Sequence, residues 1–117
     1  MLGDAARHLR SSAAIAQDDP EGAYALLYDA ARKAVEAHMA AAGYRTRSRP
    51  GSHEAVALYA RAVIAGEYVK DAHALDGMRR QRNRAEYAAW HISEARIRGD
   101  LEHAQRIVEA VRNELSL

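Results

Sequence analysis

The segment RRQRNRAEYAAWH, from Arg79 to His91, carries residue types that can bind a phosphate group and move a proton. Four arginines occupy six consecutive positions, and an acid, a tyrosine, a tryptophan and a histidine follow them. The planar, permanently charged guanidinium group of arginine can bind a phosphate and the charge that builds up in a transition state. Histidine, with a pKa of about 6.5, exchanges protons at neutral pH. The segment therefore suits the binding or cleavage of a nucleic acid.

Solvated helix charge is the alternative explanation for the same arginines. Asp76 can pair with Arg80 four residues later, and Glu86 can pair with Arg82 at the same spacing. Two of the arginines would then be ordinary surface charges, which contribute little to stability.

The charge of the whole chain does not explain this cluster. The 17 Lys and Arg residues nearly balance the 16 Asp and Glu residues, for a formal net charge of +1. Any attraction for phosphate must therefore be local. At 117 residues the chain has the size of one domain, so residues 1–117 are expected to share one core.

Several protein classes are disfavoured by composition. The chain has no cysteine, so it forms no disulfide and no thiolate metal site. No apolar run approaches the roughly 20 residues that cross a bilayer, and no membrane role is expected. The start, MLGDAARHLRSS, has charged residues where a signal peptide needs an apolar core. A cytoplasmic location is expected.

The elements that must position the arginines are helical. Only 2 prolines and 7 glycines accompany abundant alanine, arginine and glutamate, which favour helix. Apolar spacing predicts a first helix over residues 4–17. Asp19 is expected to cap a second helix that begins at Pro20. This helix is apolar over a wide arc and should be central, ending at Gly43.

Three more helices are predicted after the arginine-containing loop GYRTRSRPGS. The third is capped by Ser52 and stops near Gly66, the fourth begins near Asp71, and the fifth begins at Ser93. We expect four or five antiparallel helices in an all-α, up-and-down bundle.

The fourth and fifth helices each carry a marked stripe. Arg82 continues the apolar stripe of Leu75 and Met78, an unusual place for an arginine. Gly99-Asp100 is a candidate break in the fifth helix. Beyond it, five apolar residues form a packing seam: Leu101, Ala104, Val108, Val111 and Leu115.

The sequence Arg82-Asn83-Arg84-Ala85-Glu86-Tyr87 resembles the signature of the HEPN family (higher eukaryotes and prokaryotes nucleotide-binding domain). That signature is an arginine, often followed by asparagine, and then a histidine with about four to six residues between the arginine and the histidine. Tyr87 stands where the histidine would be, as in branches that end in an acid and a tyrosine. The segments YDAARKAVEAHMAAAG and SHEAVALYARAV resemble the family's second and third helices.

The resemblance implies a homodimer in which two motifs meet and, in active members, cleave RNA without a metal or cofactor. Arg82, Asn83 and Tyr87 would be the catalytic residues. Tyrosine has a pKa of about 10 and is a poor proton acceptor at neutral pH. Weak or absent ribonuclease activity is therefore expected.

The resemblance and the charge pattern together give a wider set of candidate residues. Glu86 and His91 are possible additions to the site, and Tyr87 and Trp90 are expected at the dimer interface. Six arginines are expected to bind the phosphates of RNA or of a nucleotide: Arg45, Arg47, Arg49, Arg79, Arg82 and Arg84.

The histidines have structural explanations that compete with a functional one. His91 follows Arg84 by seven residues, which on a helix would place both on one face, although a surface or capping role is favoured. His38 is expected either in the core, bonded to a backbone carbonyl, or near the arginines. His53, directly after the Ser52 cap, is interpreted as favouring the helix start. No metal-ligand pattern is present.

The aromatic residues are expected mainly in packing roles. Tyr24 and Tyr28, one turn apart, are predicted to pack in the core with their hydroxyl groups at its edge. Base stacking is the less favoured alternative. Trp90 is expected either at a subunit interface or over the end of the bundle.

Three functions remain open. The first is a dimeric RNA- or nucleotide-binding HEPN-like module, in a toxin-antitoxin or defence setting, with weak or no catalysis. The second is a metal-independent endoribonuclease toxin, neutralised by a nucleotidyltransferase-type antitoxin. The third is a purely structural interaction bundle, in which Arg82 and Glu86 pair and Tyr87 packs.

Overall fold

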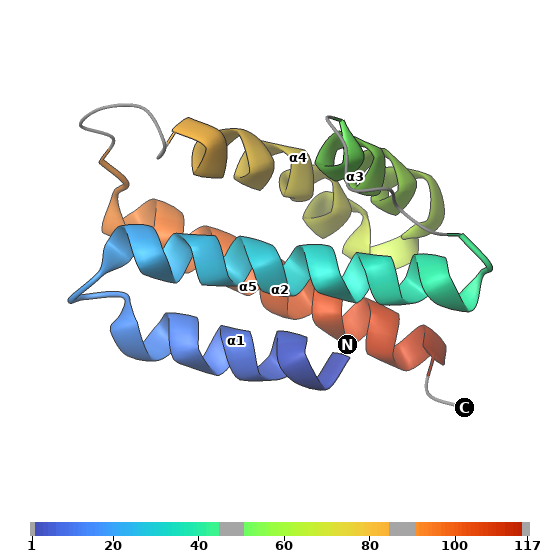
Figure 1. The fold of residues 1–117 in the computed structure, drawn as a ribbon, viewed down its shortest axis with the longest axis horizontal. Helices are drawn as coiled ribbons and strands as arrows, with labels where there is room; N and C mark the ends of the chain where they lie inside the picture. The colour runs from blue at the N-terminus through green and yellow to red at the C-terminus, as the bar shows by residue number, and fades with distance from the viewer. Residues whose placement is uncertain (1, 45–50, 85–90, 116–117) are drawn as a thin grey trace.

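The structure is a computed structural model that describes residues 2–44, 51–84 and 91–115. Over these residues the chain forms five α-helices and one turn of 3-10 helix, without a strand. The elements are α1 (Leu2–Ile15), α2 (Pro20–Ala41), α3 (Ser52–Val63), η1 (Gly66–Tyr68), α4 (Val69–Arg84) and α5 (Glu94–Leu115). The predicted all-α bundle is confirmed (Figure 1). Within this part of the chain, no helix combines the length and hydropathy that a membrane span requires.

The start and end of α2 follow the local sequence. An Asp19 side-chain oxygen accepts a hydrogen bond of 3.0 Å from the Gly22 backbone N–H, and Pro20 occupies the first helical position. Both features confirm the predicted cap. A Cβ atom on Gly22 would clash with the Asp19 carboxylate, so any larger residue there would force the capping side chain to shift. Gly43, with φ of 90°, follows the helix end in the left-handed region that glycine adopts readily.

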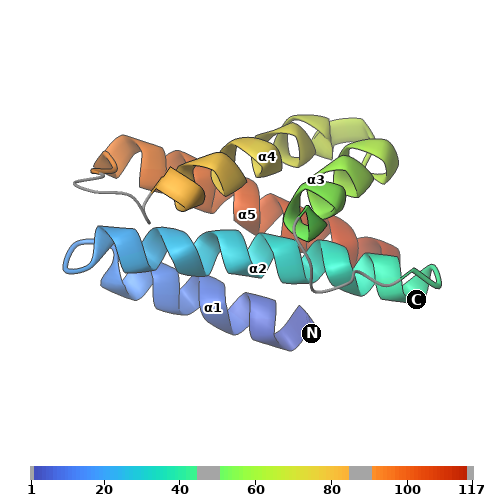
Figure 2. The same cartoon turned by 45° about the horizontal axis from the view of Figure 1, so that its top comes forward.

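The second helix is central, as predicted, because it contacts each of the other four α-helices. Figures 1 and 2 show α1 and α5 beside it and the α3–α4 pair on the opposite side from α1. The α2 and α5 helices point the same way, whereas α1 runs opposite to α2. Five alanines of α2 are buried: Ala23, Ala30, Ala31, Ala34 and Ala37. Their small side chains let neighbouring helices approach α2 closely on several sides.

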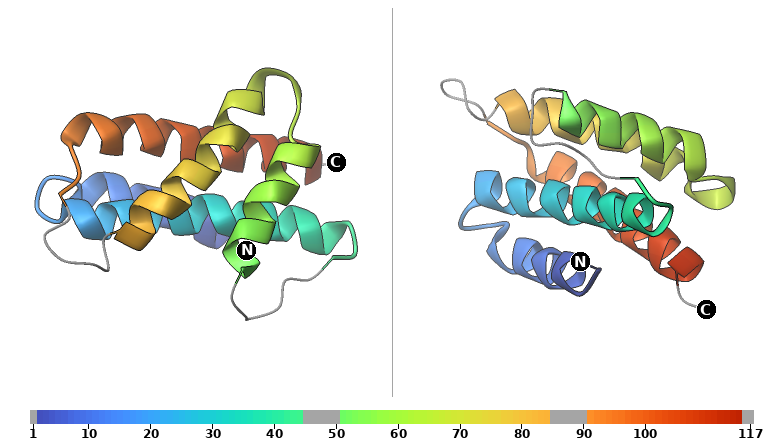
Figure 3. Two further views of the ribbon diagram at one scale, coloured as in Figure 1. Left: turned by 90° about the horizontal axis from the view of Figure 1, so that it is seen from above. Right: turned by 45° about the vertical axis from the view of Figure 1, so that its right-hand side comes forward.

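The α3 and α4 helices form a hairpin that lies obliquely across α2 and α5 (Figure 3). The predicted cap at Ser52 is wrong: Gly51 is the cap residue, Ser52 is the first helical residue, and no side chain caps this helix. The fourth helix begins at Val69, two residues before the predicted Asp71, because η1 leads directly into it. Leu75 and Met78 are buried, as their stripe predicted.

Asp71 fastens the start of α4 to α5. Its carboxylate is 3% exposed and accepts hydrogen bonds from Arg106 Nε, at 2.9 Å, and from His103 Nδ1, at 2.7 Å. Because a buried carboxylate needs such partners, this pairing fixes where α4 begins relative to α5.

The fifth helix runs without interruption from Glu94 to Leu115, so the candidate break at Gly99-Asp100 is wrong. Asp100 is buried and accepts hydrogen bonds of 2.6 Å from the Tyr24 hydroxyl and from Arg96 Nε. These bonds tie this turn to α2 and offset the low helix propensity of Gly99. The predicted seam is confirmed, since Ala104, Val108 and Val111 are buried and Leu101 and Leu115 pack against the core.

Candidate functional site

The arginines of the motif occupy the last turns of α4. Arg79 and Arg82 are partly buried, whereas Arg80, Asn83 and Arg84 are exposed. The other predicted site residues lie outside the described part of the chain: Arg45, Arg47, Arg49, Glu86, Tyr87 and Trp90. The structure therefore locates the arginine half of the motif and leaves its second half as a prediction.

Asp76 is the acid that serves the first two arginines. Its two carboxylate oxygens pair with Arg79 Nε and with an Arg80 guanidinium nitrogen, each at 2.9 Å. The predicted pairing of Asp76 with Arg80 is confirmed. This arginine is 70% exposed in its side chain, so the pair adds little stability. One carboxylate shared by two guanidinium groups still leaves a surplus of positive charge at this end of α4.

Arg82 directs its charge toward α2 and α3. Burial opposes the ionisation of Asp29 on α2, but Arg32, Lys33 and Arg82 together lower the pKa of that carboxyl below its usual value. The charge of Arg82 also acts on His53, at the start of α3. The charge of the motif arginine thus acts on groups of two other helices.

His53 lies where the start of α3 passes over α2. Its Nδ1 atom is 3.1 Å from the Tyr28 hydroxyl oxygen. Burial, and then the positive charges of Arg32 and Arg82, lower the pKa of His53 below its usual value, while Glu36 and Asp29 act in the opposite direction. These effects together favour the neutral form of the imidazole more than in an unperturbed histidine.

Tyr28 anchors this imidazole from within the core. The side chain is 1% exposed, and burial raises its pKa to about 12 despite the nearby arginines. It is thus a neutral phenol that can donate or accept one hydrogen bond with His53. The prediction that Tyr24 and Tyr28 pack in the core with hydroxyls at its edge is confirmed by their burial and by the bonds to Asp100 and His53.

Arg32 is the second guanidinium group near His53. It donates hydrogen bonds to Asp29, at 2.7 Å, and to both carboxylate oxygens of Glu36, at 3.0 and 3.1 Å. These two acids balance its charge and hold the side chain along α2. We call Tyr28, Arg32, His53 and Arg82 the His53 site.

The sequence analysis missed His53 and Arg32 as site residues. The available signal was the placement of charged residues at helical spacing within the alanine-rich α2, namely Asp29, Arg32 and Glu36. Charged side chains on a helix that is largely buried call for specific partners, and here the charges of all three act on His53 at the start of α3. The proximity of His53 to this face depends on tertiary packing, which helical spacing does not encode.

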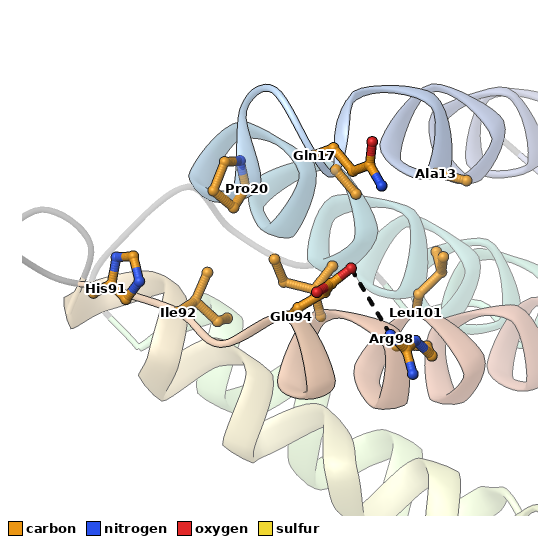
Figure 4. A pocket seen from close by; sticks show the side chains of 10 residues that line it. Ala13, Gln17, Pro20, His91, Ile92, Glu94, Arg98 and Leu101 are labelled. Carbon is orange, nitrogen blue, oxygen red and sulfur yellow. Dashed lines mark ion pairs between the residues drawn. The ribbon is translucent and has the colours of Figure 1, made fainter.

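The other two histidine candidates lie elsewhere. Both expectations for His38 are wrong: its Nδ1 is 2.7 Å from the Tyr59 hydroxyl, and its Nε2 pairs with Glu114. His91 is exposed and lies before α5 in non-helical backbone, so its spacing from Arg84 does not place the two on one helical face. It borders a groove of about 550 Å³ between the end of α1, the start of α2 and the start of α5 (Figure 4).

Among the described residues, no group of three or more histidine, aspartate or glutamate side chains is placed to hold a metal ion. Comparison with known proteins adds no assignment: no family model, curated protein or solved structure matches this chain.

Proposed function

We propose that the chain is a HEPN-like module that binds the phosphates of RNA or of a nucleotide through the arginines at the end of α4. The observation that carries the proposal is that Arg82 is partly buried at the end of α4. Its charge acts on both Tyr28 and His53, which lie 3.1 Å apart. A positive group fixed beside neutral hydrogen-bonding groups is suited to recognition of an anion.

Local charge supports the same conclusion. Asp76 is shared between Arg79 and Arg80, and Arg84 is exposed at the end of the helix. Phosphates of a bound RNA would release counterions on meeting this surface. Some of these arginines interact favourably with the negative, C-terminal end of the α4 helix dipole. That interaction does not require the charge of Arg82 to act on α2 and α3.

The resemblance to the HEPN family motivates the rest of the proposal. The module would act as a homodimer in a toxin-antitoxin or defence setting, with a nucleotidyltransferase-type antitoxin as a possible partner. Tyr87 in the position of the family's histidine makes the motif itself a weak catalyst. The endoribonuclease alternative is favoured by one observation: the His53 ring lies 3.1 Å from the Tyr28 hydroxyl, where the charge of Arg82 lowers the pKa of the imidazole.

Fluorescence anisotropy with a labelled single-stranded RNA tests the binding. We expect Arg82→Ala to weaken the affinity by roughly tenfold or more, because a charge-assisted contact is lost. Arg7→Ala is the matched control, since Arg7 is a largely exposed arginine on α1, away from α4. Affinity should also fall steeply with added salt, and Arg45→Ala should reduce that slope. An equal loss of RNA affinity in Arg82→Ala and Arg7→Ala would contradict the proposal, and so would the absence of RNA binding by the wild-type chain.

A further inference from the structure

We infer that the bound RNA is single-stranded and that one of its unpaired bases stacks on the ring of Tyr44, directly after the end of α2. The inference rests on the proposed RNA binding and adds to it a contact with a base, whereas the arginines of α4 contact phosphates. Tyr24 and Tyr28 are each 1% exposed and cannot stack a base. Tyr44 is 59% exposed, the largest fraction among the large hydrophobic side chains that the structure describes.

The end of α2 fixes the backbone of Tyr44. The N–H of Gly43 donates to the Ala40 carbonyl at 3.1 Å, and the N–H of Tyr44 donates to the Met39 carbonyl at 2.8 Å. Gly43 has a φ of 90°, in the left-handed region. These features make a Schellman motif, in which the residue after the glycine is tied back to the last turn of the helix. Tyr44 is therefore held in one position relative to α2.

The ring of Tyr44 is supported by α3. It contacts the ring of Tyr59 edge to face, with centroids 5.9 Å apart and planes inclined by 64°. The Tyr59 hydroxyl lies 2.7 Å from His38 Nδ1, and His38 Nε2 pairs with Glu114. An edge-to-face contact covers at most one face of either ring, so at least one face of Tyr44 is left uncovered by Tyr59. A base can stack on this face without reordering the side chain, which favours binding.

The sequence places positive charge directly after this ring. Arg45 follows Tyr44, and Arg47 and Arg49 follow at alternate positions. Proteins that bind single strands combine aromatic side chains, on which bases stack, with positive groups that follow the phosphates. The three arginines lie outside the described part of the chain, so the support that they give comes from the sequence. An aromatic ring beside this charge matches a single-stranded nucleic acid better than it matches an apolar protein surface.

The place of Tyr44 in the molecule indicates the size of the ligand. The molecule measures 40 Å along its longest axis. The end of α2 and the end of α4 lie toward opposite ends of this axis (Figures 1 and 2). A strand of several nucleotides can contact both places at once, whereas a mononucleotide occupies one of them. The inferred ligand is therefore single-stranded RNA and not a mononucleotide.

Fluorescence anisotropy with the full chain and a labelled single-stranded RNA oligonucleotide tests the inference. We expect Tyr44→Ala to weaken the affinity by about fivefold or more, because the stacking of one base is lost. Tyr44→Phe keeps the aromatic ring and should bind within about twofold of wild type. Leu58→Ala is the matched control, since Leu58 is 58% exposed and apolar. It offers no ring for stacking, so this variant should also bind within about twofold of wild type.

Two further measurements separate stacking from charge. The slope of log affinity against log salt concentration should be the same in Tyr44→Ala and in wild type, because stacking releases no counterions. An abasic oligonucleotide of the same length keeps its phosphates but has no base to stack. It should bind wild type and Tyr44→Ala equally.

The outcomes distinguish this inference from the proposed function. Unchanged RNA affinity in Tyr44→Ala, or equal binding of normal and abasic RNA by the wild-type chain, would overturn the inference and leave phosphate binding by the arginines intact. A different mass of Tyr44→Ala in light scattering would assign the ring to a protein interface and also overturn the inference. Absence of RNA binding by the wild-type chain would overturn both.

Discussion

Tyr28 shows how one buried hydroxyl can serve both stability and the site. Tyr28 belongs to α2, and its ring is buried in the core. Its hydroxyl oxygen lies 3.1 Å from Nδ1 of His53 and orients that ring. Tyr24, one turn earlier, makes the equivalent bond to Asp100 of α5. Burial raises the pKa of both phenols above the ordinary value. Both tyrosines therefore resist ionisation in the folded state.

This resistance predicts a loss of stability in alkali. Tyrosine in the unfolded chain has a pKa of about 10, and folded Tyr28 has a pKa of about 12. Below the unfolded value both states are protonated and the contribution is complete. As pH rises from one value to the other, the unfolded chain loses its proton first, so the free energy of unfolding falls. Urea titrations across this range should show a shallower fall in Tyr28→Phe.

Tyr44→Phe is the control for that experiment, because Tyr44 is 59% exposed. It should retain the wild-type pH dependence. Identical slopes in wild type and Tyr28→Phe would show that Tyr28 ionises as readily in the folded chain as in the unfolded one.

At the scale of the elements, the sequence predicted those helix boundaries that depend on hydrogen bonds between near neighbours in the chain. Asp19 and Pro20 set the start of α2, and the wide apolar arc of this helix indicated its central place. Ser52 failed as a cap because Gly51 takes the cap position. Gly99 failed as a break because Asp100 is held by a partner 76 residues away in sequence. Such long-range bonds cannot be read from propensity.

The residues of the His53 site also divide into those that local sequence indicated and those that it did not. The helical stripe placed Arg82 in line with Leu75 and Met78, and Arg82 is partly buried in the structure, because consecutive turns of one helix decide this alignment. His53 could not be found, because its distance from Arg82 along the chain is bridged only when α3 and α4 pack together. Arg32 was not predicted as a site residue, because the alanine-rich composition of α2 indicated a helix of the core.

The cap of α2 gives a direct test of local control. Asp19→Ala removes the acceptor of the Gly22 backbone N–H and should lower the free energy of unfolding by about 1 kcal/mol. Chemical denaturation followed by circular dichroism would measure the change. Asp18→Ala is the matched control, since Asp18 is an exposed neighbouring acid with no cap bond among those described for this helix. A loss as large in Asp18→Ala would attribute the effect to charge near the helix start.

At the scale of the whole molecule, the place of the motif predicts how two copies assemble. The motif arginines lie at one end of α4, so a twofold axis there would place two motifs face to face. We predict a homodimer that buries Tyr87 and Trp90. Light scattering at micromolar concentration should give twice the chain mass, and Trp90→Ala should shift the equilibrium toward monomer because an aromatic anchor is lost.

The exposed Tyr44, near the end of α2, provides the control for assembly. Tyr44→Ala removes an exposed aromatic side chain away from α4 and should leave the mass unchanged. A wild-type chain that scatters as a single copy would reject the predicted dimer.

At the buried alanines of α2, the protein should tolerate a smaller residue better than a larger one. Each alanine contributes a single methyl group to a site that other helices approach closely, so there is little volume to remove. Replacement by glycine costs about 0.5–1 kcal/mol through backbone freedom. Any larger side chain must displace a neighbouring helix, at a cost of about 1–3 kcal/mol or more. Natural variation at these positions of α2 should therefore exclude large side chains. Divergent relatives should keep small residues there, while their surface residues change freely.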